Sequence, residues 1–118
     1  MIAWQKARVL RKRVADMTRL SSFRREWDLV DQMRRSARSI MANIAEGFDK
    51  HSRPEFHRFL GIAKGSSAEL RSDLYAAVDD GLINDKQFQQ FYALCEEVAC
   101  ILGGLRSSLR RSNDPVAQ

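Results

Sequence analysis

Apolar residues recur at steps of three and four along most of the chain, which is the spacing of one face of an α-helix. The first stripe consists of Ala3, Ala7, Leu10, Val14 and Met17. Three further stripes have the same period, and no segment alternates apolar and polar residues as a strand would. Four amphipathic helices joined by short turns predict an all-α, antiparallel up-and-down four-helix bundle.

Small residues and a glycine are expected to end the first two helices. The first helix should cover about residues 3–20 and end at Ser21-Ser22, and the second should cover about residues 23–49. Gly47 lies near the end of the second helix, where a left-handed residue commonly closes a helix. The residues of this segment that we expect to fill the core are Ile40, Ile44 and Phe48.

Two capping boxes mark the beginnings of the third and fourth helices. In Ser52-Arg53-Pro54-Glu55 and in Asn84-Asp85-Lys86-Gln87, the first side chain can accept the N–H of the fourth residue, whose own side chain reaches back. Gly81 is expected to end the third helix. We therefore predict one bundle domain over residues 1–111 and a flexible polar tail over residues 112–118.

The composition fits a single soluble domain. The chain has 118 residues, of which 44% are hydrophobic and 30% are charged, so it is long enough to bury a core. No apolar run approaches the roughly 18–20 residues that a membrane span needs. Basic residues interrupt the apolar residues at the N-terminus, which is not the pattern of a signal peptide, so a cytoplasmic location without membrane contact is expected.

The net charge of +5 is distributed unevenly along the chain. Residues 1–58 contain 14 Lys and Arg against 7 Asp and Glu, a net +7, whereas residues 59–118 contain 6 against 8, a net −2. A basic half suggests a polyanionic partner. The alternative is a solvated face whose charges pair within the chain, as Asp31 with Arg35 would at helical spacing.

Basic residues gather on one side of each of the first two helices. The candidate nucleic-acid-binding residues are Arg8, Arg11, Lys12, Arg34, Arg35 and Arg38. Arginine suits this role because its planar guanidinium forms paired hydrogen bonds with phosphate. Aromatic residues between the bases are sparse, and we interpret Trp4 and Trp27 as half-buried packing residues rather than as surfaces for base stacking.

Small residues lie one turn apart in the third helical segment. Gly61, Gly65 and Ala68 share a face, although a glycine inside a helix costs about 1 kcal/mol relative to alanine. Close approach of another helix explains such a face. The partner helix could belong to the same protomer or to a second copy of the chain, and the spacing leaves both open.

Nothing in the sequence points to catalysis, and we predict no enzyme activity, no cofactor and no metal. His51 and His57 do not form an H-E-x-x-H or E-x-x-H pattern, and neither a phosphate-binding glycine loop nor a nucleophile elbow is present. A metal-dependent corner formed by these histidines and Glu46 is the weaker alternative. Asn43 and Glu46 are interpreted as structural rather than functional residues.

The two cysteines lie in the fourth helical segment. Five residues separate Cys95 from Cys100, which places them about 140° apart around a helix. They are therefore expected to be buried free thiols, not a disulfide or a metal site.

Two stretches of the sequence resemble the signature of a known family. Ser39–Gly47 (SIMANIAEG) and Phe59–Leu70 (FLGIAKGSSAEL) are similar to the conserved stretches of the four helix bundle protein family, also called the 23S ribosomal-RNA intervening-sequence protein family. The resemblance covers nearly the whole chain. Met41 stands where the family usually has proline, so an uninterrupted second helix is expected.

The resemblance implies properties that the residue pattern does not. Such proteins form antiparallel four-helix bundles that assemble as homopentameric rings, and the related accessory proteins of diversity-generating retroelements bind nucleic acid and a reverse transcriptase. The resulting hypothesis is a non-enzymatic, basic, homo-oligomeric module that binds RNA or DNA through phosphates with little sequence specificity. The alternative is an oligomeric scaffold for a protein partner, such as a polymerase or reverse transcriptase.

Overall fold

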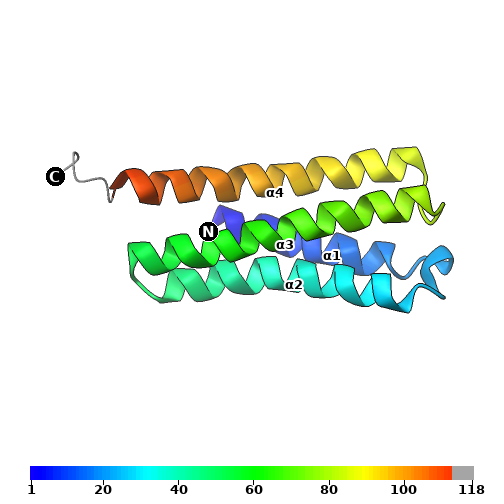
Figure 1. Cartoon of the computed structure of the whole chain (residues 1–118), viewed down its shortest axis with the longest axis horizontal. Coiled ribbons are helices and arrows are strands. Elements are labelled where there is room, and N and C mark those ends of the chain that lie inside the picture. Colours follow the sequence, from blue (N-terminus) through cyan, green and yellow to red (C-terminus); the bar gives the residue numbers. More distant parts are fainter. Residues whose placement is uncertain (113–118) are drawn as a thin grey trace.

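The computed structural model describes the backbone of residues 1–112 and the side chains of residues 1–110. Four helices, α1 (Ile2–Met17), α2 (Trp27–Asp49), α3 (Arg53–Asp79) and α4 (Asp85–Ser112), run antiparallel in an up-and-down bundle, as Figure 1 shows. A short 3-10 turn, η1 (Ser21–Phe23), joins α1 to α2. The described residues contain no strand, so the predicted all-α bundle is confirmed.

The predicted apolar stripes meet in one core. Each helix contributes fully buried side chains to it, among them Leu10, Val14, Met33, Ile40, Ile44, Leu60, Leu70, Leu74, Val98 and Leu102. Phe23 of η1 is also buried, and its neighbour Ser22 donates a 2.7 Å hydrogen bond from Oγ to the carbonyl oxygen of Leu82. The α1–α2 and α3–α4 turns are thereby tied together at one end of the bundle.

The first helix is much shorter than the others, and this leaves part of α2 uncovered. α1 has 16 residues against 23 in α2, and its N-terminus stops short of the α2–α3 turn in Figure 1. Phe48, in the last turn of α2, is 53% exposed and borders an apolar hollow with Met1 and Trp4. The prediction that Phe48 fills the core is therefore wrong, because its ring borders the open hollow at the start of α1.

The predicted capping boxes differ in how completely they form. Asn84 Oδ1 accepts the N–H of Gln87, and Gln87 Oε1 accepts the N–H of Asn84, both at 2.8 Å. Ser52 Oγ accepts the N–H of Glu55 at 3.4 Å, but the Glu55 carboxylate binds the Arg58 guanidinium through two 3.2 Å hydrogen bonds instead of reaching back. Only the second box is therefore reciprocal.

Two glycines near helix ends have different roles. Gly81 has a φ of 73° and follows the end of α3, as expected. Gly47 does not close α2, because the helix continues to Asp49 and the left-handed conformation falls on His51, with a φ of 55°. Instead, Gly47 is buried against Phe59 of α3, so the absence of a side chain at this position lets α2 and α3 approach closely.

The helix bounds also depart from prediction at the first turn. α1 ends at Met17, earlier than predicted, because the backbone N–H groups of Arg19 and Leu20 donate to carbonyl oxygens three residues back and η1 follows. α2 accordingly begins at Trp27, and it passes through Met41 without interruption, as expected. The last described helix continues to Ser112, and the predicted flexible tail otherwise lies outside the described residues.

Candidate nucleic-acid interface

A basic hollow lies between α1 and α2. Its volume is about 140 Å³, and its lining side chains are Arg11, Ala15, Arg19, Arg34 and Arg38. These residues meet because α1 and α2 are antiparallel neighbours. Side chains from both helices line the one hollow. No described carboxylate lines this basic hollow, which distinguishes it from the mixed polar surface between α2 and α3.

Arg34 is the most firmly held of these side chains. Its Nε donates a 2.9 Å hydrogen bond to Oγ1 of Thr18, which in turn donates to the carbonyl oxygen of Val14. Thr18 is buried, so the contact holds the half-buried guanidinium at the end of α1. Nε is only one of the donor groups of arginine, and the terminal nitrogens keep further donors for a ligand.

Two of the six predicted residues are paired with acids. Lys12 Nζ lies 2.9 Å from an Asp16 carboxylate oxygen, and Arg35 lies 2.7 Å from Asp31. The Lys12 hydrogen bond lowers the pKa of Asp16, with smaller help from the nearby Arg19 and Arg13 charges. Both pairs are well exposed, and such pairs contribute little stability, so a phosphate can compete for the cations.

The remaining four predicted residues have no carboxylate partner among the described side chains. Arg11, Arg34 and Arg38 line the basic hollow, and Arg8 lies further along α1 with its guanidinium 5.8 Å from the centre of the Trp4 ring. The structure therefore brings three of the six predicted residues together. Arg19 also lines the basic hollow, although it was not one of the six predicted residues. Its guanidinium lies 3.2 Å from an Asp16 carboxylate oxygen.

Arg38 also borders a second hollow, which lies between α2 and α3. This hollow is larger, about 510 Å³, and its lining is Gln32, Arg35, Ser36, Arg38, Ser39, Ala42, Ser66 and Glu69. Ser39 and Ser66 share a 2.8 Å hydrogen bond across it, and Asn43 donates to Ser39 twice, which supports the structural role predicted for Asn43. Arg35 therefore belongs to a mixed polar surface and not to the basic hollow.

The small residues of α3 do not share one environment. Gly61 is half-buried against Arg106 of α4, whose Nε donates to the carbonyl oxygen of His57 at 3.4 Å. Gly65 and Ala68 are exposed, and a Cβ added at Gly65 would meet nothing within 4 Å. The alternative that a helix of the same protomer packs closely on these two residues is therefore wrong. An interface between copies of the chain stays a prediction.

The histidine corner shows no arrangement for metal binding. His51 is exposed, whereas burial and the Arg106 charge lower the pKa of His57. Among the described side chains, no group of three or more His, Cys, Asp or Glu could hold a metal ion.

The two cysteines of α4 differ in exposure. Burial raises the pKa of Cys95 to about 12. Cys100 is exposed, so the prediction of two buried thiols is wrong for Cys100.

The fold and this surface define a basic, all-α helical-bundle protein. Residues 1–104 match the family described as 23S rRNA-intervening sequence protein, and the chain belongs to that family. The crystal structure of a protein with unknown function from the S23 ribosomal protein family of Bacteroides thetaiotaomicron VPI-5482 has the same fold. The TM-score is 0.82 and the identity 22%, over 88% of this chain and 97% of that one.

No curated protein sequence is significantly similar to this chain. Neither the family description nor the similar crystal structure names an enzymatic reaction. In the part of the chain that the structure describes, each helix is either too short or too polar to cross a membrane.

Proposed function

We propose that the protein is a non-enzymatic basic module that binds RNA or DNA through phosphates along its α1–α2 face. The observation that carries this proposal is the basic hollow, which gathers four arginines from two sides without a described carboxylate in its lining. Guanidinium groups bind phosphate oxygens with paired, charge-assisted hydrogen bonds. Phosphate contacts position a nucleic acid but carry no sequence information, so little sequence specificity is expected.

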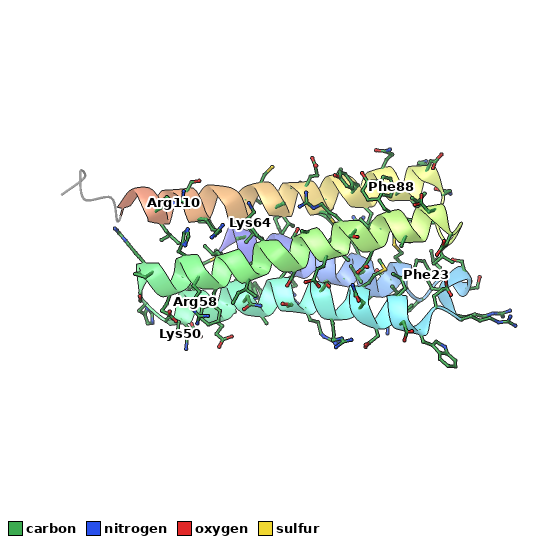
Figure 2. All side chains as sticks on the ribbon, in the orientation of Figure 1. Phe23, Lys50, Arg58, Lys64, Phe88 and Arg110 are labelled. Carbon is green, nitrogen blue, oxygen red and sulfur yellow. The ribbon has the colours of Figure 1, made fainter. Side chains whose placement is uncertain are left out.

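The experiment compares two triple variants with equal loss of charge. The test variant is Arg11→Gln, Arg34→Gln and Arg38→Gln, and the control is Arg58→Gln, Lys86→Gln and Arg110→Gln on α3 and α4. Figure 2 shows Arg58 and Arg110 at the end of the bundle remote from Phe23 in the α1–α2 turn. Fluorescence anisotropy measures the affinity for a labelled duplex at several salt concentrations.

The two variants should differ in the slope of affinity against salt. Each phosphate of duplex DNA that the protein no longer neutralises makes the negative slope of log affinity against log salt shallower by about 0.9, so the test triple should reduce its magnitude by up to about 2.7. The control keeps the slope of the unmodified protein, because its residues lie outside the basic hollow. Equal slopes in the two triples, or an affinity that is flat with salt, contradict the proposal.

We also propose that copies of the chain associate through the outer face of α3. Gly65 and Ala68 are exposed there, and Ile62 beside them is 42% exposed. A flat face of small residues next to an apolar side chain suits the close approach of another helix. Association would place several basic hollows on one assembly, so that individually weak phosphate contacts add up through multivalency.

The alternative function, a scaffold for a protein partner such as a polymerase or reverse transcriptase, uses the same basic face against an acidic surface. A pull-down after nuclease treatment separates the two functions. A partner that survives nuclease and no longer binds the test triple would favour the scaffold. A partner that disappears with the nucleic acid would favour the phosphate-binding module.

A further inference from the structure

Trp27 presents its ring to solvent. It is 78% exposed, the largest exposed fraction among the large hydrophobic side chains that the structure describes. Its Nε1 donates a 3.1 Å hydrogen bond to the carbonyl oxygen of Arg24, so one edge of the indole is anchored to the backbone of the turn. The expectation that Trp27 is half-buried in packing is therefore wrong, and the ring is available to a ligand.

The residues around the ring are mainly polar. Arg25, Glu26, Asp28 and Leu29 line a shallow hollow of about 280 Å³ with Trp27. Arg24 and Arg25 are exposed, and neither pairs with a carboxylate within the described residues. Asp28 lies in the first turn of α2, where the helix dipole stabilises a negative charge. The exposed ring therefore lies among charged side chains of both signs, a setting that is poorly suited to an apolar partner.

The helical register places Trp27 in line with the basic hollow. Arg34 and Arg38 follow Trp27 by seven and eleven residues along α2. At 3.6 residues per turn, the three positions fall within about 40° of one another around the helix axis. The rise per residue puts Arg34 about 10 Å and Arg38 about 16 Å from Trp27 along the helix. The ring therefore lies on the same side of α2 as Arg34 and Arg38, and we call this side the α2 track. Asp31, which pairs with Arg35, lies between Trp27 and Arg34 along the helix.

We propose that this track binds single-stranded nucleic acid, with an unpaired base stacked on Trp27 and the neighbouring phosphates held by Arg34, Arg38 and the Arg24–Arg25 turn. The inference rests on the proposed phosphate-binding function and names its preferred substrate. An aromatic ring beside a positively charged groove is the usual arrangement for single strands, because every base has a face that can stack. The bases of a duplex are already stacked and paired, so they cannot cover the ring without strand opening.

Trp4, at the other end of the same face, provides a matched control. It is half-buried, and the Arg8 guanidinium lies over its ring at 5.8 Å. Because Arg8 occupies that ring, Trp4 is not expected to stack with a base. The chain contains two tryptophans, so Trp4→Phe leaves Trp27 as the sole indole whose fluorescence reports on a ligand.

The test uses the full chain carrying Trp4→Phe and titrates it with an oligothymidylate of about 12 nucleotides, within the usual range of site sizes. Quenching of the Trp27 fluorescence is expected with the single strand and not with a duplex of the same length. In a separate variant, Trp27→Ala should weaken single-strand binding by about 5- to 150-fold, the range that removal of one stacking ring produces. Trp27→Phe should restore part of the affinity.

The controls separate this inference from the function on which it rests. If Trp27→Ala leaves single-strand affinity unchanged, or weakens duplex binding equally, while the arginine triple still lowers both, stacking is refuted and phosphate binding stands. If oligoglutamate quenches Trp27 as strongly as the oligonucleotide, charge alone explains the signal and stacking is again refuted. If the arginine triple binds both nucleic acids as the unmodified protein does, both proposals fail.

Discussion

The tight packing at Gly47 allows a quantitative test of how α2 packs on α3. A Cβ added to Gly47 would lie 2.7 Å from Cβ of Phe59 and 3.1 Å from Cδ1 of Phe56. Rotation of the Phe59 side chain cannot relieve the first overlap, because its Cβ is fixed to the α3 backbone. Gly47→Ala therefore requires the two helices to separate, and overpacking of this kind costs about 1–3 kcal/mol.

A glycine with free space provides the matched comparison. Gly65→Ala adds the same methyl group to α3, where nothing within the protomer lies within 4 Å, and should gain up to about 1 kcal/mol from helix propensity in the unassociated protomer. Gly47→Ala gains less from propensity, because Gly47 lies in the last turn of α2. The two variants should therefore differ in their free energies of unfolding by about 1–4 kcal/mol, with Gly47→Ala the less stable.

Urea denaturation followed by far-ultraviolet circular dichroism measures both variants. The midpoint should fall for Gly47→Ala and rise for Gly65→Ala at an unchanged m-value, since the surface exposed on unfolding is nearly the same. Each curve is repeated at several protein concentrations, because association would make the midpoint depend on concentration. If Gly47→Ala is as stable as Gly65→Ala, the helices do not approach as closely as described.

Three further predictions concern stability and association. Burial raises the pKa of Asp73, so its charged form destabilises the fold. Asp73→Asn should therefore raise the urea midpoint at neutral pH. This gain in stability should vanish at about pH 4. Asn84→Ala removes a reciprocal cap and should cost about 1 kcal/mol by urea denaturation, whereas Asn84→Asp should cost little. Gly65→Glu should reduce the mass measured by light scattering if copies meet at α3, whereas Lys86→Glu should not; equal masses would refute that interface.

The helices and their caps could be predicted because their signals are local. The spacing of apolar residues, a capping box and a terminal glycine each depend on residues within a turn or two. Gly81 and Asn84 accordingly behave as expected. The exposure of Phe48 depends instead on where a different helix begins. Phe48 borders the hollow at the start of α1, and no periodicity within α2 contains that information.

The candidate binding surface was predictable in part for a similar reason. The spacing of Arg34 and Arg38 fixes their common side of α2, and the antiparallel turn brings Arg11 to it. The i,i+4 spacing of Lys12 and Asp16 already indicated their ion pair. Asp31, however, lies three residues from Arg34 and four from Arg35, so spacing alone could not say which of the two it binds. Gly47 posed the same difficulty, because a glycine near a helix end fits both a left-handed cap and a close approach of helices.

The unequal packing among the helices explains why the arginine triple should remain folded. The most extensive packing joins α2 to α3 and α3 to α4, whereas α1 packs less extensively on its neighbours. The arginines of the basic hollow lie at the margin of that core, and Arg34 alone among them donates a described hydrogen bond to a buried partner, the Thr18 hydroxyl. Arg34→Gln keeps a donor for that hydroxyl while removing the charge. A loss of affinity in the arginine triple with an unchanged urea midpoint therefore measures phosphate binding itself.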